Sequence, residues 1–530
     1  MSDDDNEVSW WVHVDRGVTV LKYIVSCMAV VLSFMVVIYG IALDYNLGNF
    51  GGPSIEFILF LFSLTLLAAN EGFQVAVLHS QHIAAEDIRT QGHHRAACVH
   101  ELMFGTPAAP KVGRVKNLLM GQSFFVVVCS FTLANLTTFD GMPNFLGIND
   151  TTFRALVCSG LPGIIIVINV AQLTPSLLAK EYPLRCLNIP GIYSTIYAAL
   201  ALEHCGVVHF VYVLYGIINS TFFGPEVPVD EMPDLLSNHP YSSHGTSTHG
   251  SAAAGNDESN DDDNDDDEQG CVVAVEPAVA VAKSTAYFIK VAFSTLLTVL
   301  CVAFVIGSIG TGHSSVDISV GAAFVVSLLV LVIVTYCEGL KVAVVSTTHL
   351  RSDDLGDWPN AQRVHQLLNN DVKEGVKKFL IGRQLTVVPL GFVFAHLTHF
   401  VHMNRENFNS ATYFLIVEAG LPGVLILLQF AQLTPQLLAE QNSIPFMNIP
   451  GNYLLSVWTL QLEKLGIVNF TWLFYGVIEN LLCTKRKDGE EYQQPAARNP
   501  LTSCLQDDSG HGLLFDCSFR SGPEPESAQL

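Results

Sequence analysis

Long apolar segments separated by polar ones dominate the pattern of this 530-residue chain. A helix needs about 20 apolar residues to cross the hydrocarbon core of a bilayer. The first apolar segment follows an acidic N-terminus and is too long for the apolar region of a signal peptide, so we interpret it as a spanning helix. Ten segments predict transmembrane helices, at 18–43, 55–78, 117–139, 155–174, 190–219, 284–309, 317–345, 378–400, 411–434 and 450–481.

The second half of the chain repeats the first. Residues 160–218 match residues 420–478 at 27 of 59 positions without a gap, and both copies contain Gly-Leu-Pro-Gly and Ala-Gln-Leu-Thr-Pro. Residues 71–74 (Glu-Gly-Phe-Gln) likewise correspond to residues 338–341 (Glu-Gly-Leu-Lys). Self-similarity on this scale indicates duplication of one structural unit.

An odd number of spans in each half would insert the second copy upside down relative to the first. The pattern therefore predicts an all-α polytopic membrane protein with ten transmembrane helices in two inverted-topology five-helix repeats. Such repeats are typical of secondary transporters, which alternate access around a central site. The expected organisation is an N-terminal tail (1–17), repeat one (18–219), an acidic disordered linker (220–283), repeat two (284–481) and a C-terminal tail (482–530).

Composition agrees with a membrane protein and narrows its partners. Only 14% of residues are charged, against about 25% in soluble domains. The net charge of −23 lies largely in the linker and tails, with 14 acidic residues in 220–283. No basic stripe indicates a nucleic-acid partner, and no nucleophile elbow, P-loop or metalloprotease motif indicates an enzyme. We expect neither catalytic residues nor a metal site. Basic residues number twelve on the side of the termini and seven on the other in this topology, which favours cytoplasmic termini.

Polar residues inside apolar spans need a partner or a function. Glu71 and Gln74 lie one turn apart in span two, and Glu338 and Lys341 occupy the same places in span seven. An intrahelical Glu338–Lys341 ion pair is the alternative to a functional site here.

Spans four and nine each carry the Gly-Leu-Pro-Gly motif and then a glutamine before Thr-Pro, at Gln172 and Gln432. Helix breaks at corresponding positions of two repeats often mark a binding site, although glycines can also serve only close helix packing. Spans five and ten carry Glu203 and Glu463 at their middle. These carboxylates could bind a cation, carry a proton or pair with a buried arginine such as Arg383.

Taken together, these motifs resemble the diatom-type silicon transporters, a ten-span duplicated family with paired E-G-x-Q and G-R-Q motifs. The matching residues are 71–74 and Gly382-Arg383-Gln384, with Gln-Leu-Thr at 172–174 and 432–434. This sequence departs from the pattern twice: Lys341 replaces a glutamine, and Gly121-Gln122-Ser123 stands where G-R-Q is expected.

The resemblance implies uptake of silicic acid across the plasma membrane, coupled to Na⁺, with no other cofactor. Silicic acid is an uncharged polyol near neutral pH, so its site needs several hydrogen-bonding groups. The expected substrate-binding residues are Gln74, Gln122, Gln172, Arg383, Gln384 and Gln432. Glu71, Glu203, Glu338 and Glu463 are the expected ion-binding or coupling residues, and Lys341 is expected to set selectivity.

Two further functions are compatible with the sequence. Lys341 and Arg383 could serve a transporter of another small oxyacid or anion, such as borate or bicarbonate. A non-transporting silicic acid sensor or regulatory subunit with altered motifs is the third hypothesis. Fluxes of each solute across liposomes distinguish the three.

Overall fold

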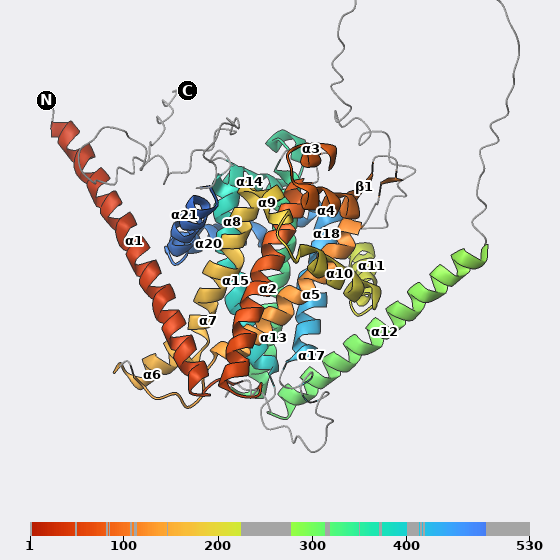
Figure 1. Ribbon diagram of the computed structural model, residues 1–530, viewed down its shortest axis with the longest axis horizontal. Coiled ribbons are helices and arrows are strands. Elements are labelled where there is room, and N and C mark those ends of the chain that lie inside the picture. The colour runs from red at the N-terminus through yellow and green to blue at the C-terminus, as the bar shows by residue number, and fades with distance from the viewer. Residues whose placement is uncertain are drawn as a thin grey trace, which may run out of the picture.

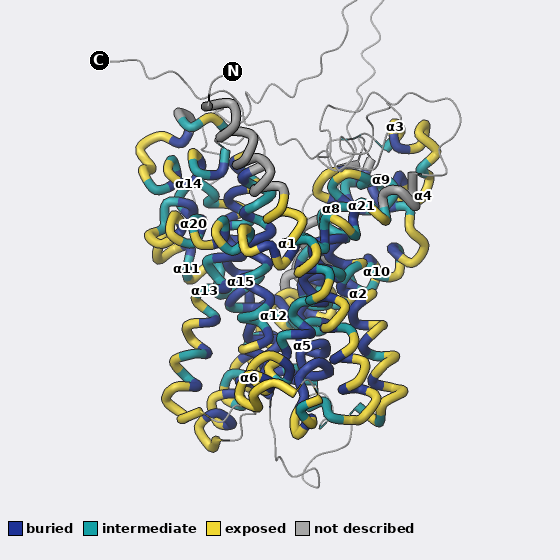
Figure 2. The backbone as a smooth tube through the Cα atoms, turned by 90° about the vertical axis from the view of Figure 1, so that its left-hand side faces the viewer, coloured by how far each residue is buried: buried dark blue, intermediate teal, exposed yellow. Residues whose placement is uncertain are grey.

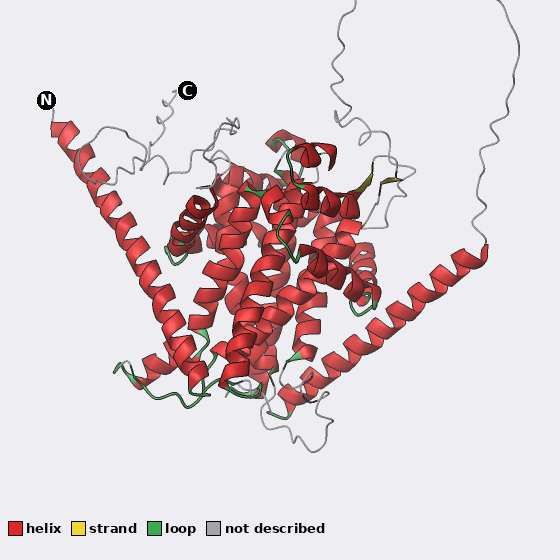
Figure 3. Cartoon of the chain, in the orientation of Figure 1, coloured by secondary structure: helices red, strands yellow, loops and turns green. Residues whose placement is uncertain are grey.

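The computed structural model consists almost entirely of helices (Figures 1 and 3). It describes a first half, residues 3–223, and a second half, residues 277–483. Short gaps lie at 48–49, 81–82, 84, 107–108, 111–113, 146, 313–317, 349, 370–373, 400–412, 414–415 and 417–418. Most of the expected acidic linker (224–276) and of the C-terminal tail (484–530) lies outside the described residues.

The first half begins with a helix that starts at Asp3, well before the expected span at residue 18. Its elements are α1 (Asp3–Ala42), α2 (Pro53–Ser80), α3 (Ala85–Thr90), α4 (His94–Phe104), a two-residue antiparallel pair β1 (Gly105–Thr106) and β2 (Ala109–Pro110), α5 (Arg114–Thr137), α6 (Asp150–Phe153), the π-helix η1 (Arg154–Cys158), α7 (Leu161–Ile166), the π-helix η2 (Val167–Leu173), α8 (Thr174–Glu181), α9 (Pro183–Leu187), α10 (Ile192–His204), α11 (Phe210–Ile218) and the π-helix η3 (Asn219–Phe223).

The second half repeats this order. Its elements are α12 (Pro277–Gly310), α13 (Val320–Thr347), the 3₁₀ turn η5 (Ser352–Leu355), α14 (Pro359–Asn369), α15 (Glu374–Thr398), α17 (Leu421–Ile426), the π-helix η8 (Leu427–Leu433), α18 (Thr434–Gln441), α19 (Ser443–Met447), α20 (Asn452–Glu463) and α21 (Asn469–Cys483).

Eight helical segments of the described chain are long and apolar enough to cross a bilayer, four in each half. Hydrocarbon offers no hydrogen-bond partners to the backbone, and a helix satisfies these groups within itself. The expectation of ten spans is therefore not met in the described residues. The eight are Gly17–Ala42, Pro53–Ser80, Leu118–Thr137, Leu161–Glu181, Thr285–Gly310, Val320–Thr347, Gly375–Thr398 and Leu421–Gln441.

The segments expected to form spans five and ten fold instead as two helical hairpins, α10–α11 and α20–α21. Gly206 (φ +84°) and Gly466 (φ +77°) lie in the turns between the paired helices. Glycine permits this left-handed backbone because it has no Cβ. The 13 residues of α10 extend about 20 Å, short of the roughly 30 Å of a hydrocarbon core.

Each hairpin tip is attached to the first helix of the other half. Ser294 Oγ of α12 donates to the carbonyl of Val207 (2.6 Å) and accepts from the amide of Phe210 (2.9 Å). Ser26 of α1 makes the same pair of bonds to the second hairpin, at 2.7 and 2.8 Å. Each serine lies nine residues inside its apolar segment, so the tips reach about 13 Å along it. The hairpins therefore enter the apolar region and turn back.

The two halves run in the same direction. Thr138 directly follows α5 and its Oγ1 lies 2.8 Å from Nε2 of His396, near the C-terminal end of α15, so these corresponding helices end at one face. Figure 1 shows α3, α4 and α14 together at the opposite face. Four crossings, an even number, return the chain to the face where it began. The inverted-topology relation is therefore not confirmed: in the described residues corresponding helices of the two halves run in the same direction, as in parallel repeats.

The outer and inner surfaces of the bundle differ as expected for a protein in lipid. Leu21, Met28 and Met35, spaced by seven residues on α1, are 58–66% exposed and form one apolar stripe. Phe131 and Phe392, by contrast, are fully buried where α5 and α15 meet. Figure 2 shows buried residues concentrated between the halves and exposed ones on the outer surface.

Candidate functional site

A cavity lies between the two halves and is lined by both. Water-molecule centres can reach about 50 Å³ of it, and one water needs about 10–15 Å³ on this measure. The cavity therefore suits a solute with few heavy atoms. Its polar lining comes from α2, α5 and η2 of the first half and from α13, α15, η8 and α18 of the second: Glu71, Gln74, Ser123, Ser130, Gln172, Glu338, Lys341, Arg383, Gln384, Gln432 and Gln436.

Eight of the eleven residues expected in a site line this one cavity. They come from five separate elements and lie up to 361 positions apart, from Glu71 to Gln432. Gln122, Glu203 and Glu463 do not line it.

The motif glycines bring the helices together behind the cavity. A Cβ on Gly382 would lie 1.8 Å from the carbonyl oxygen of Thr459 in α20, and one on Gly121 would lie 2.1 Å from that of Ala199 in α10. A Cβ on Gly339 would lie 2.1 Å from the ring of Phe446. These positions need glycine because any side chain would collide with a neighbouring helix.

The Thr-Pro breaks shape the two π-helical segments that carry Gln172 and Gln432. Thr174 Oγ1 donates to the carbonyl of Asn169, and Thr434 Oγ1 donates to that of Gln429, both at 2.6 Å. The threonines thereby satisfy carbonyls near the bulge that each proline leaves in the helix.

The Gly-Leu-Pro-Gly motif itself serves packing. A Cβ on Gly163 would lie 1.9 Å from Thr137 Oγ1, and one on Gly423 would lie 2.2 Å from Thr398 Oγ1. Of the two readings of spans four and nine, close packing applies to the glycines and cavity lining applies to the glutamines that follow.

One ion pair is buried at the cavity wall. Arg383 Nη1 donates to Oε1 of Glu338, and Gln436 Nε2 donates to Oε2 of the same carboxylate at 2.9 Å. Glu338 thus pairs with α15 and not with Lys341 on its own helix. Arg383 is likewise not the partner of Glu203 or Glu463, as the sequence had suggested.

A comparison with protein families decides the relationship of this chain. The family model described as silicon transporter matches residues 5–226 and 269–511. The chain belongs to the silicon transporter family. The match spans both halves and includes every residue that lines the cavity. Neither a curated protein nor a solved structure matches it.

Gln122 does not line the cavity; it is buried in α5 at 1% exposure. Neither atom of its amide has a hydrogen-bond partner among the described residues. It stands at the position that corresponds to Arg383. A glutamine there is shorter than arginine and does not reach the cavity.

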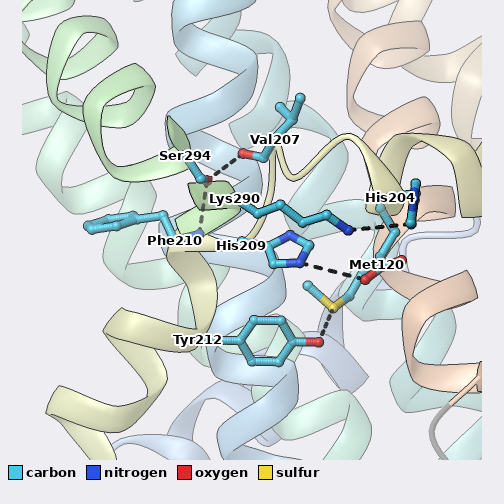
Figure 4. A network of polar contacts seen from close by, with 9 residues as sticks. Met120, His204, Val207, His209, Phe210, Tyr212, Lys290 and Ser294 are labelled. Atoms are coloured by element: carbon cyan, nitrogen blue, oxygen red, sulfur yellow. Dashed lines mark hydrogen bonds and ion pairs between the residues drawn. The ribbon is translucent and has the colours of Figure 1, made fainter. Parts of the chain in front are cut away.

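Glu203 and Glu463 lie at the hairpin tips, at the C-terminal ends of α10 and α20, and not in the middle of a span. Figure 4 shows the first tip, where Lys290 Nζ approaches His204 Nδ1 at 3.4 Å. His209 Nε2 lies 3.8 Å from Oε1 of Glu203. The tip is therefore a polar cluster of α10 and α12, separate from the central cavity.

Three polar residues that line the cavity were not anticipated: Ser123, Ser130 and Gln436. Gln436 lies four residues after Gln432, one helical turn on, so the sequence did contain a signal for it. Ser123 corresponds to Gln384 in the repeat and could have been found the same way. The position of Ser130 depends on how α5 packs.

Proposed function

We propose that this silicon transporter moves silicic acid across the membrane through the cavity between its two halves. The observation that carries the proposal is the convergence of Gln74, Gln172, Gln384 and Gln432 on one small cavity. An amide both donates and accepts hydrogen bonds. Four of them, from both halves, suit a compact neutral polyol whose hydroxyl groups point in several directions.

Unpaired polar atoms support a polar solute in this cavity. Gln172 Oε1 and Arg383 Nε are buried and have no hydrogen-bond partner among the described residues. Buried polar groups in proteins are normally hydrogen-bonded. An acceptor and a donor at the cavity wall match a hydroxyl group, which can serve both.

The balance of charge favours a neutral solute over an anion. Two carboxylates, Glu71 and Glu338, line the cavity together with two cations, Lys341 and Arg383. An oxyanion such as borate or bicarbonate would add a third negative charge to a site largely shielded from water, which is costly. Silicic acid adds none.

Parallel halves suggest how the cavity changes access. In transporters with two parallel repeats, alternating access is largely a rocking of one half against the other around a fixed site. Both halves line the cavity, so rocking would open it on the side where contacts between the halves break and close it on the other side.

The orientation of the chain follows from its basic residues. The connections 81–116 and 348–378 contain five lysines and arginines each, and they include α3, α4 and α14, which lie at one face. The connections at the other face contain only Arg154 and Arg405. Because basic loops tend to stay in the cytoplasm, this bias supports cytoplasmic termini, which we propose. The plasma-membrane location implied by the resemblance stays a prediction.

Silicic acid uptake into proteoliposomes tests the proposed function. Gln384→Ala removes an amide from the cavity and is expected to reduce uptake at least tenfold. Gln461→Ala, the same change at an exposed position of α20, is the matched control and leaves uptake unchanged. Saturable binding of silicic acid without flux would instead support the sensor hypothesis, and flux of borate or bicarbonate alone would support the anion hypothesis.

A further inference from the structure

A second pocket lies at the tip of the first hairpin, where α10 and α11 meet α12 (Figure 4). Water-molecule centres can reach about 410 Å³ of it. None of its residues lines the central cavity, so it is a separate site. Six of the side chains that line it carry polar atoms: Glu203, His204, His209, Tyr212, Tyr287 and Lys290.

The surface around this pocket faces lipid. Next to it on α12, Phe288, Ile289 and Phe293 are 49–68% exposed. Lys290 lies five residues inside the apolar segment that begins at Thr285, about 7.5 Å along the helix. A lysine at that depth reaches the headgroup region by extending its stem outward. The pocket therefore lies at the boundary between lipid headgroups and acyl chains.

The pocket holds a positive and a negative charge apart. Lys290 Nζ lies 3.4 Å from Nδ1 of His204, and Oε1 of Glu203 lies 3.8 Å from Nε2 of His209. In the part of the chain that the structure describes, no ion pair joins Lys290 to Glu203, although opposite charges attract strongly where water is scarce. The wall thus presents a cation and a carboxylate at separate places.

The histidines extend each end of this pocket. An ammonium group can only donate hydrogen bonds, so Nδ1 of His204 accepts from Lys290 and the other ring nitrogen carries the proton. That N–H is a second donor beside the ammonium group. His209 is 3% exposed, and its ring lies 5.8 and 5.9 Å from those of Tyr212 and Tyr287, measured between centroids. These rings hold it beside Glu203.

We propose that this pocket binds the headgroup of a zwitterionic phospholipid with a primary ammonium group. The phosphate would accept hydrogen bonds from Lys290 and His204, and the ammonium group would donate to Glu203. Hydrogen bonds between charged groups of this kind are short and strong. A quaternary ammonium group has no N–H to donate, and an anionic headgroup would bring a second negative charge close to Glu203.

The bound headgroup would join the two halves, because Glu203 belongs to the first half and Lys290 to the second. The hairpin that it fixes also packs on α5 close to the central cavity. Tyr212 Oη donates to Sδ of Met120 at 3.3 Å, and a Cβ on Gly121 would lie 2.1 Å from the carbonyl oxygen of Ala199. The inference does not depend on which solute the central cavity takes.

Native mass spectrometry of the purified full chain tests this site. Phosphatidylethanolamine, phosphatidylcholine and phosphatidylglycerol with the same acyl chains are added in turn. We expect the chain to bind the first of these lipids at least fivefold more tightly than either of the others. Lys290→Gln and Glu203→Gln should each weaken that binding at least fivefold, whereas Lys290→Arg keeps the positive charge and should preserve it.

The control variant is Lys377→Gln, which removes a half-buried lysine of α15 that does not line the pocket. It should bind phosphatidylethanolamine as the native chain does, and thermal melting in detergent confirms that every variant is folded. Equal binding of the three lipids, tightest binding of phosphatidylglycerol, or a preference that survives both Lys290→Gln and Glu203→Gln would overturn the proposal. So would displacement of the lipid by an equal concentration of soluble glycerophosphoethanolamine, since the ligand would then not be a lipid.

Discussion

Thr138 Oγ1 and His396 Nε2 lie 2.8 Å apart and join the C-terminal ends of α5 and α15, one helix from each half. On the same two helices, Phe131 and Phe394 form an edge-to-face pair with ring centroids 6.5 Å apart. Phe131 also lines the cavity, and all four side chains are buried. These contacts close the interface between the halves on the face of α6.

Thr138→Val is expected to loosen that closure. The substitution keeps the shape of the side chain but removes the hydrogen bond to His396, which is worth about 1 kcal/mol. Ser130 lines the cavity, so Ser130→Cys reports access to it. We expect a membrane-impermeant thiol reagent added on the α6 side to modify Ser130→Cys several times faster when Thr138→Val is also present. An unchanged rate relative to Ser130→Cys alone would show that the pair does not hold this end closed.

Glu338→Gln should destabilise the protein much more than Glu71→Gln. Removing one partner of a buried ion pair costs about 3–5 kcal/mol because the other charge stays buried and unpaired. Arg383 would lose its counter-charge, whereas Glu71 makes no direct ion pair among the described residues. Thermal melting in detergent measures the difference. Equal melting temperatures for the two variants would argue against the pairing of Glu338 with Arg383.

Gly382→Ala should disturb the contact between α15 and α20. Its Cβ would lie 1.8 Å from the carbonyl oxygen of Thr459, so the helices must separate. Overpacking of this kind typically costs about 1–3 kcal/mol. Gly216→Ala is the control, since nothing lies within 4 Å of a Cβ there. A drop in melting temperature for Gly382→Ala alone confirms the close approach; similar values for both contradict it.

Topology distinguishes parallel from inverted halves directly. Epitope tags inserted after Gln91 and after Asp357, both exposed, should require permeabilised cells for antibody binding. Tags inserted after Asp140 and after Thr311, exposed at the other face, should bind antibody on intact cells. In an inverted arrangement the tags after Gln91 and Asp357 would lie on opposite sides.

The sequence predicted the helical class, the duplication and most of the cavity. Glu71, Gln74, Glu338 and Lys341 could be found because hydrocarbon strongly disfavours polar groups, so those within apolar segments stand out. Polar residues also occur at corresponding positions of the two copies, 71 and 74 in the first and 338 and 341 in the second, which strengthened the prediction. The pairing of Arg383 with Glu338 was missed, since spacing along a chain does not show which helices face each other.

The direction in which the second half runs relative to the first could not be predicted. It depends on the hairpin turns at Gly206 and Gly466. Residues 190–219 are apolar enough for one span, but Gly206 reverses the chain and Ser294 binds the exposed backbone at the tip. Apolarity measures how well a segment suits lipid and does not reveal whether it crosses. Counting this segment as a span in each half gave five expected crossings instead of four. That odd number predicted inverted halves and placed Glu203 and Glu463 in the middle of a span.

The even number of crossings in each half bears on how such a chain could arise. A single half would insert with the same orientation whether alone or fused, because it begins and ends at one face of the bilayer. Two identical copies could therefore associate through a two-fold interface of the kind that Ser26 and Ser294 now form, before any gene fusion. Fusion would then free each half to diverge, as at the corresponding positions 74 and 341, where the first half has glutamine and the second has lysine.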